Sequence, residues 1–246
     1  MMAELRERIS KLLAFLDDLF FPDHVRCLSC TRALEGDETD RICPDCAKAL
    51  QTLMARQEAL SREEFRALPP GVDYVSAAYP YEEQARTLVR RLKYRGVRAA
   101  AVPLARAMCM LPGGEEEVLV PVPTTKGRLR ERGFNQAEVL AERIARELGM
   151  PVVCALTRKD ERAAQATLSA EKRRRNLVGS MRADGRVSGK RVLLVDDVYT
   201  TGSTAEEAAR ALRQAGARSV GVFVAARPVP ARAQKGLFGR EWRAFF

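Results

Sequence analysis

The segment from residue 192 to 204, Val-Leu-Leu-Val-Asp-Asp-Val-Tyr-Thr-Thr-Gly-Ser-Thr, constrains this chain more than any other. Its first four residues are apolar and two are β-branched, which predicts a buried strand. Hydroxyl residues and a glycine then lead into a predicted helix over residues 205–215. The segment therefore predicts one strand–turn–helix unit of an α/β fold.

The turn between this strand and helix contains the side chains and backbone groups that could bind a ligand. Adjacent carboxylates accept hydrogen bonds from a vicinal diol, and the backbone N–H groups and hydroxyls at a helix N-terminus favour a phosphate. Taken alone, the Thr-Gly-Ser-Thr stretch is explained equally well by ordinary helix capping. A diol beside a phosphate describes a ribose 5-phosphate. The predicted ribose-phosphate site consists of Asp196, Asp197, Thr200, Thr201, Gly202, Ser203 and Thr204.

Strands and helices alternate from residue 72 onward. Strands are predicted over residues 75–81, 118–122, 152–156, 192–195 and 220–225, and helices over 82–94, 99–111, 136–148 and 205–215. This order predicts an α/β fold with a parallel sheet flanked by helices, in which ligands bind beyond the carboxyl ends of the strands. The charged segment 158–176 has no clear apolar stripe, which predicts a mobile loop or an exposed helix.

Residues 1–70 have a different organisation. An amphipathic helix is predicted up to about residue 26, a cysteine-rich module follows to about residue 50, and a charged helix covers 51–66. The Leu-Pro-Pro-Gly stretch at 68–71 then interrupts the chain. We therefore predict two domains, residues 1–70 and residues 71–246.

Four cysteines form two Cys-x2-Cys pairs in the first of these domains. Two such pairs supply four thiolates in the tetrahedral arrangement that structural zinc prefers, and they leave no position open for water. A redox dithiol or disulfides are the competing interpretations. If the cysteines hold a structural zinc ion, its removal would unfold this module and leave the other domain intact. The predicted zinc ligands are Cys27, Cys30, Cys43 and Cys46.

Charge and histidine content narrow the function classes. The formal net charge of +10 favours polyanionic partners, although a solvated basic surface explains it as well. The N-terminus does not resemble a signal peptide and no stretch approaches a membrane span, so we expect no membrane insertion and a cytoplasmic location. The single histidine, His24, lies outside the second domain, which excludes a Ser-His or Cys-His hydrolase there.

The stretch Arg-Glu-Arg-Gly-Phe-Asn-Gln at residues 130–136 is the second distinctive motif. It belongs to a predicted basic loop that precedes a helix capped by Asn135. Arg128, Arg130 and Arg132 predict an anion site in this loop, and a solvated basic loop is the alternative interpretation. The segment 192–204 resembles the phosphoribosyl-diphosphate (PRPP) motif of type I phosphoribosyltransferases. Together the two motifs resemble the ComF family of competence-associated, phosphoribosyltransferase-like proteins.

Further elements carry the same resemblance. The Leu-Lys-Tyr-Arg-Gly stretch at 92–96, the loop pattern of Gln165, Leu168, Arg173 and Asn176, and the paired cysteines all match the ComF pattern. The chain departs from it in having only four cysteines in the module, and in Met181, where an aromatic residue is common. Neither departure touches the PRPP motif.

The resemblance implies roles for individual residues. Asp196 and Asp197 would hold the ribose hydroxyls of PRPP, and residues 200–204 would wrap its 5-phosphate. Residues 158–176 would form the hood or flexible loop that covers the site, and Mg²⁺ would bind mainly through oxygens of the ligand. The expected pyrophosphate loop consists of Thr124, Thr125 and Lys126.

Two functions follow from these observations. The first is a PRPP-binding protein of DNA uptake and natural competence, with single-stranded DNA and competence-machinery proteins as partners. The second is an active phosphoribosyltransferase acting on an unidentified nitrogen acceptor. Tyr94, Tyr199 and Phe134 are candidates for stacking on bases, although single aromatic residues more often pack in the core. The candidate nucleic-acid contacts are Arg128, Arg130, Arg132, Lys172, Arg173, Arg174 and Arg175.

Overall fold

The computed structural model describes residues 26–34, 39–64, 68–94, 96–159 and 179–229. The predicted N-terminal helix, His24, most of segment 158–176 and the end of the chain lie outside these ranges. Among the helices inside them, none combines the length and apolarity that crossing a bilayer requires.

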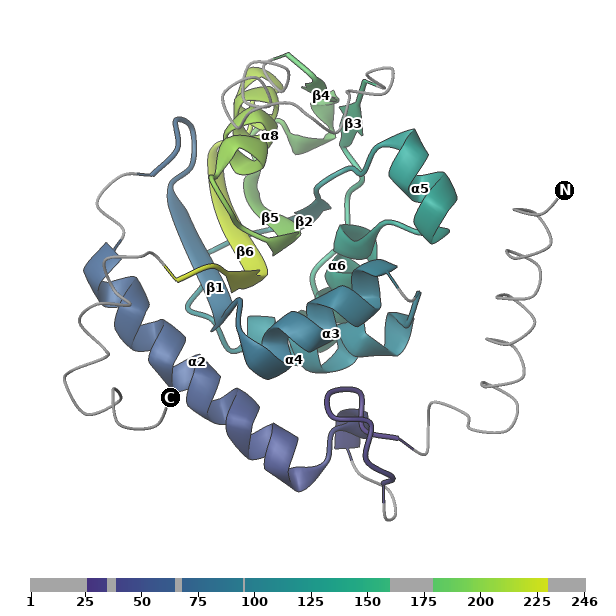
Figure 1. The fold of residues 1–246 in the computed structure, drawn as a ribbon. Helices are drawn as coiled ribbons and strands as arrows, with labels where there is room; N and C mark the ends of the chain where they lie inside the picture. Colours follow the sequence, from purple (N-terminus) through teal and green to yellow (C-terminus); the bar gives the residue numbers. More distant parts are fainter. Residues whose placement is uncertain (1–25, 35–38, 65–67, 95, 160–178, 230–246) are drawn as a thin grey trace, which may run out of the picture.

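Four parallel strands form the central sheet, in the order β1-β6-β5-β2 (Figure 1). They are β1 (Tyr74–Pro80), β6 (Ser219–Arg227), β5 (Arg191–Val198) and β2 (Val118–Pro121). Parallel strands covered on both faces are apolar along most of their length, and this explains the unbroken run Val-Leu-Leu-Val at the start of β5.

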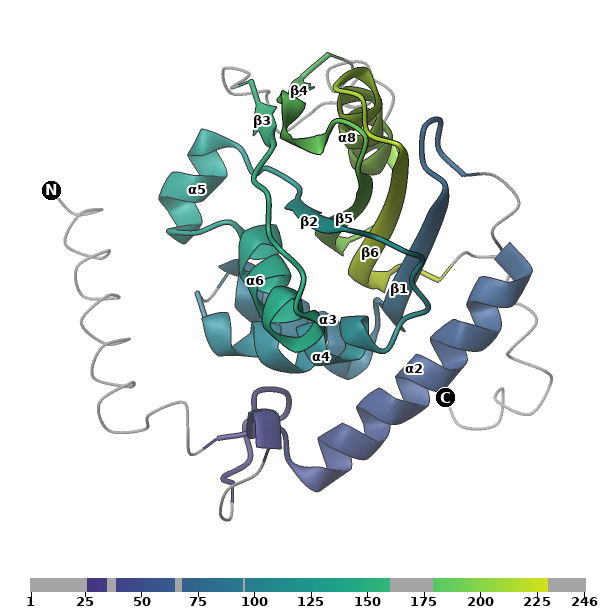
Figure 2. The ribbon, with the colours of Figure 1, turned by 180° about the vertical axis from the view of Figure 1, so that it is seen from behind.

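Helices cover both faces of the sheet, as the alternation of elements predicts. Helices α3 (Glu83–Tyr94), α4 (Ala101–Cys109) and α6 (Gln136–Leu148) lie on one face, and α8 (Ser203–Gln214) lies on the other (Figures 1 and 2). Successive side chains of a strand point to opposite faces. Leu193 and Val195 accordingly belong to the hydrophobic cluster of α3, α4 and α6, whereas Val192 and Leu194 belong to that of α8.

One predicted strand is partly wrong. Within residues 152–156, Val152 makes only an isolated parallel bridge to Leu119, and the strand proper, β3 (Leu156–Arg158), begins later. The reason is a tight turn in which the Ala155 N–H donates to the Val153 carbonyl, which interrupts pairing with the central sheet. β3 instead pairs antiparallel with β4 (Met181–Ala183).

The cysteine module continues directly into helix α2 (Pro44–Glu64), which begins seven residues earlier than the predicted helix at 51 (44 against 51). Proline is well suited to the first turn of a helix, so Pro44 sets this start and places Cys46 on the helix. α2 runs from the module alongside β1 (Figure 1). Cys27, Leu50 and Leu53 share one hydrophobic cluster with Leu92 and Tyr79, so packing is continuous across the predicted boundary at residue 70.

Candidate functional site

An open cleft of about 370 Å³ lies at the carboxyl ends of the parallel strands. All four strand ends contribute to it, through Tyr81 after β1, Pro123 after β2, Asp196 in β5 and Pro228 after β6. This edge is where open parallel sheets bind ligands, and the volume suits a small molecule. Residues from α3, α6 and the short helix α5 (Lys126–Arg132) complete the lining.

Asp196 and Asp197 both line this cleft, from opposite faces of β5. Asp197 forms an ion pair with Lys93 of α3, with 2.9 Å between Oδ1 and Nζ, and the two side chains are 10% and 18% exposed. Burial, followed by the neighbouring charge of Asp197, raises the pKa of Asp196 to about 7. The Asp197 N–H, Lys93 and Arg158 act in the opposite direction on that pKa. Asp196 is therefore close to its protonation midpoint at neutral pH.

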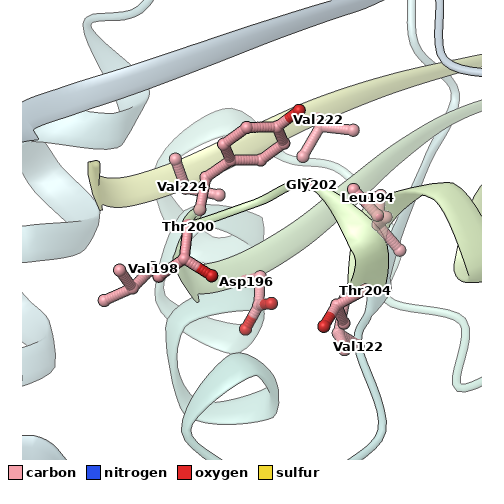
Figure 3. A pocket seen from close by; sticks show the side chains of 11 residues that line it. Val122, Leu194, Asp196, Val198, Thr200, Gly202, Thr204, Val222 and Val224 are labelled. Carbon is pink, nitrogen blue, oxygen red and sulfur yellow. The ribbon is translucent and has the colours of Figure 1, made fainter. Parts of the chain in front are cut away.

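The loop after β5 encloses a small hollow of about 20 Å³ that opens beside Asp196 (Figure 3). Thr200, Gly202 and Thr204 line it, and Figure 3 shows the Asp196 carboxylate between the side chains of the two threonines. Gly202 has φ +78° and is the N-cap of α8, which has no side-chain cap. The first N–H groups of α8 are thus oriented toward the loop, as an anion site requires.

The remaining hydroxyl residues of the loop lie at its rim. Thr201 Oγ1 and Ser203 Oγ are 2.9 Å apart and bond to each other, and neither residue lines the cleft or the hollow. Of the seven residues predicted for a ribose phosphate, five therefore line the cavities and two flank them.

The predicted basic loop after β2 is wrong, because residues 126–132 form helix α5. Thr125 caps it by accepting a hydrogen bond from the Arg128 N–H, and Gly133 ends it with φ +77°. Thr124 lines the cleft, whereas Thr125 and Lys126 begin the helix. Residues four positions apart on a helix lie on the same face, so the helix decides which of its arginines point in the same direction.

Only part of the predicted basic set lies at the cleft. Arg128 and Arg132, four residues apart on α5, line it, and Arg130 does not. Lys172, Arg173, Arg174 and Arg175 lie outside the described residues.

Sequence reasoning missed Lys93 and Gln136, which line the cleft from the end of α3 and the start of α6. Tyr94, named from the sequence only as a candidate for base stacking, and Asn135, named only as a helix cap, also line it. Asn135 also donates from Nδ2 to the Val122 carbonyl (3.0 Å) and accepts from the Ala137 N–H, which fixes α6 against the end of β2. The motifs at residues 92–96 and 130–136 marked these positions without indicating their contacts.

The four cysteines predicted as metal ligands converge, with all sulfur atoms within 4.8 Å of one another. Cys30 and Cys43 Sγ are 3.7 Å apart, which matches the separation of about 3.8 Å expected for tetrahedral Zn–S bonds of about 2.3 Å. The N–H groups of Ser29 and Cys43 donate to Cys27 Sγ. None of the four is in a disulfide, so the residues fit a structural zinc ion.

Arg32 adds positive charge to this cluster. Its Nη2 donates to Cys43 Sγ at 3.2 Å and also pairs with Asp45. Burial by itself raises the pKa of Cys43, but the Arg32 hydrogen bond and contacts from Cys46 and Cys30 outweigh it and lower the pKa to about 6. A thiolate is the form that binds a metal, so this arrangement favours binding.

Comparison with known proteins identifies a matching domain family and several similar bacterial proteins. Residues 135–238 match the phosphoribosyl transferase domain family. The DNA utilization protein YhgH of Escherichia coli K12 is 31% identical over 210 residues, which cover 80% of this chain and 88% of that protein. The competence protein ComFC of Bacillus subtilis 168 is 30% identical over 214 residues, covering 83% and 85%.

A solved structure is also similar over part of the chain. It is the glutamine phosphoribosylpyrophosphate amidotransferase of B. subtilis complexed with ADP and GMP, with a TM-score of 0.40 and 25% identity. The match covers 52% of this chain and 26% of the amidotransferase, so this chain spans about a quarter of that protein.

Proposed function

We propose, from the premise that this chain belongs to the ComF family of competence-associated proteins with a phosphoribosyltransferase-like domain, that its cleft binds PRPP or a related ribose 5-phosphate. The observation that carries the proposal is a juxtaposition. Asp196, Asp197 and the loop at residues 200–204 lie together at the carboxyl edge of the sheet. The diol of one ligand can therefore reach the carboxylates while its phosphate reaches the loop. In keeping with its relatives, the protein acts in DNA uptake.

The ligand occupies the cleft in a defined direction. The ribose hydroxyls donate to the carboxylates, and the 5-phosphate accepts from the loop and from the first N–H groups of α8. Thr124 and Arg128 also line the cleft, and we assign them to the pyrophosphate. Mg²⁺, a hard cation that retains water, would neutralise the pyrophosphate and would bind chiefly through oxygens of the ligand.

The acidic pair also favours a second function, phosphoribosyl transfer to a nitrogen acceptor. In this reaction the nitrogen attacks C1 of the ribose, pyrophosphate leaves with the bonding electrons, and positive charge develops on the sugar. Catalysis then depends on orientation and charge stabilisation, and no protein nucleophile is required. A protein that only bound DNA would have no need of two carboxylates beside a phosphate loop.

Single-stranded DNA is the proposed macromolecular partner, together with proteins of the competence machinery. The net charge of +10 favours a polyanion, and Arg128 and Arg132 present two cationic groups on one face of α5. The cysteine cluster is proposed to hold a structural zinc ion.

Calorimetric titration of PRPP with Mg²⁺ tests the binding proposal. We expect the wild-type protein to bind and the Asp196→Asn/Asp197→Asn variant to lose at least tenfold in affinity, because an amide accepts the ribose hydroxyls less well than a carboxylate does. Glu142→Gln/Glu147→Gln removes two exposed carboxylates of α6 outside the cleft and serves as the charge-matched control. Equal binding by the aspartate variant, or none by the wild type, would contradict the proposal.

A further inference from the structure

Helix α8 buries a charged side chain, that of Glu207, which is only 4% exposed. Its Oε1 accepts a hydrogen bond from the Met181 N–H at 2.9 Å, and the Gly179 N–H also donates to this carboxylate. Arg210 donates from Nε to Oε2 at 2.8 Å and from Nη2 to Oε1 at 2.7 Å. A carboxylate is stable at a buried position only when it is paired and hydrogen-bonded in this way.

Glu207 and Arg210 together hold both backbone groups of Met181, the first residue of β4. While Glu207 accepts from the Met181 N–H, Arg210 Nη2 donates to the Met181 carbonyl at 3.1 Å. β4 lies beside α8 in both views of the molecule (Figures 1 and 2). Two side chains of a helix thus take the place of a neighbouring strand at this point of β4. We call these two residues the α8 clamp.

On its other edge β4 pairs with β3, and there the clamp reaches Arg158. Met181 is directly opposite Arg158, next to the hydrogen bond from the Lys159 N–H to the Ser180 carbonyl. Because the N–H and carbonyl of Met181 are bonded to α8, Arg158 and Met181 form a non-hydrogen-bonded pair, in which the Cα atoms lie only about 4.5 Å apart. A shift of β4 on α8 would therefore move Arg158 as well.

Arg158 contributes positive charge to the cleft. Burial, followed by the charge of Asp197, raises the pKa of Asp196, and Arg158 opposes this change more weakly than Lys93 does. A guanidinium group in the cleft also attracts the phosphate groups of an anionic ligand. The charged groups that line the cleft with Asp196 come from β5, α3, β3 and α5, and they are Asp197, Lys93, Arg158, Arg128 and Arg132.

The helix that carries the clamp also begins the proposed phosphate site. Thr204, in the first turn of α8, lines the cleft, and Glu207 follows it by three residues. Neither Glu207 nor Arg210 lines the cleft. One rigid element therefore determines where Arg158 lies relative to the loop at residues 200–204.

We propose that Glu207 and Arg210 are positioning residues, which hold Arg158 in the cleft so that one ligand contacts both Arg158 and the loop at residues 200–204. This inference rests on the proposed function, because it gives a role in binding a ribose phosphate to two residues outside the cleft. The clamp acts on the backbone of Met181, so this role does not depend on the side chain at position 181.

Titrations of ribose 5-phosphate into single and combined variants test the clamp. Arg158→Met should lose about tenfold in affinity, the scale of one charged hydrogen bond. Glu207→Leu/Arg210→Met removes the clamp without leaving an unpaired buried charge, and it should lose between about threefold and tenfold. The variant with all three substitutions should bind no more weakly than Arg158→Met, because the clamp acts through Arg158. Losses that multiply would overturn the proposal.

The midpoint of the pH dependence is a second readout, which a general loss of stability would not move. Arg158→Met and the clamp variant should both shift it upward, because a positive charge that favours ionised Asp196 is removed or displaced. Arg210→Lys replaces the clamp variant if that variant does not fold. It keeps a cation beside Glu207 but lacks the planar fork that also reaches the Met181 carbonyl, so the midpoint should again rise. An unchanged midpoint in variants that bind more weakly would contradict the role of the clamp.

Arg213→Met is the matched control. The Arg213 side chain lies on the same helix and is 32% exposed, against 33% for Arg210, but it pairs with Asp73 at 2.6 Å. This variant should keep the wild-type affinity and midpoint. If the wild type binds ribose 5-phosphate and either Arg158→Met or the clamp variant binds equally well, the clamp is overturned and the proposed function stands. If the wild type does not bind it, the proposed function fails and the clamp fails with it.

Discussion

At the scale of single residues, the end of β5 brings Asp196, Asp197 and Lys93 together in the cleft. Asp197 is compensated by an ammonium group 2.9 Å away, whereas Asp196 has a pKa raised to about 7, first by burial and then by the charge of Asp197. Arg158 provides a further opposing positive charge. Lys93 therefore positions and neutralises the carboxylate of Asp197, and it lowers the pKa of Asp196.

This arrangement predicts a pH dependence of ligand binding. A carboxyl group whose pKa is raised is protonated below that pKa and then accepts ribose hydroxyls poorly, so affinity for ribose 5-phosphate should rise with pH through about 7 and level off above it. Lys93→Met removes a cation and should move the midpoint upward by about 1 pH unit or more. Lys93→Arg should keep the wild-type midpoint.

The measurement is the dissociation constant at a series of pH values. Asp196→Asn should abolish the step near pH 7 and retain the titration of the ligand's own phosphate near pH 6. A purely structural role for Lys93 would leave the midpoint unchanged in Lys93→Met, which would refute the assignment.

At the scale of elements, the geometry of the loop at residues 200–204, the proposed phosphate site, depends on how α8 begins. Gly202 has a positive φ, and a Cβ there would lie 2.9 Å from Cζ of Tyr199 and 3.1 Å from Cγ of Pro69. The chain can take this turn only because the residue has no side chain. The loop is thereby held between α8 and the residues that precede β1.

Gly202→Ala should therefore displace the loop and weaken binding of ribose 5-phosphate or inorganic phosphate. We expect a loss of about 1–2 kcal/mol in unfolding free energy from the left-handed backbone alone, with an additional steric cost. Gly133→Ala is the matched control, since Gly133 has a similar φ of +77° and a Cβ added there would meet no atom within 4 Å. Denaturant unfolding and phosphate titration of both variants measure the difference, and equal losses in the two would rule out the steric contribution.

At the scale of the whole molecule, the cysteine module and the sheet domain are packed as one body. Cys27, Leu50 and Leu53 lie in the hydrophobic cluster that α3 and α4 share. Ion pairs reinforce this contact, one between Asp40 and Arg106 and one between Arg56 and Glu82 at 2.7 Å. From this packing we expect the module and the sheet domain to unfold cooperatively, whereas the sequence alone led us to expect that the module unfolds independently.

Removal of the metal should accordingly lower the midpoint of a single thermal transition of the whole protein. The reason is that loss of the cluster exposes apolar groups belonging to the common core. Differential scanning calorimetry with and without a chelator measures this, with Cys43→Ser as the ligand variant and Cys154→Ser, outside the cluster, as its control. Two separate transitions on chelation would instead support independent domains.

Much of the fold could be predicted from the sequence because its signals are local. The β-branched apolar run identified β5, and the 3.6-residue period together with Asn135 and Gly149 gave the bounds of α6. The Cys-x2-Cys spacing identified the four cysteines that cluster. A helix cap, the alternation of side chains along a strand and a pair of closely spaced cysteines each depend only on residues near one another in the sequence. The strand at 152–156 and the loop at 126–132 were mispredicted where a tight turn and a threonine cap changed the local backbone.

The sequence by itself thus determined most of the elements of this ComF-family chain, together with the two acidic residues and the hydroxyl-rich loop that follow the apolar part of β5. Only the tertiary structure decided that Lys93 reaches Asp197, that Arg132 covers Tyr94, and that the cysteine module joins the core of the sheet domain. These contacts join elements far apart along the chain, namely α3 with β5, α3 with α5, and the module with α3 and α4. Their geometry is fixed by how helices pack on the sheet, which no local pattern of residues specifies.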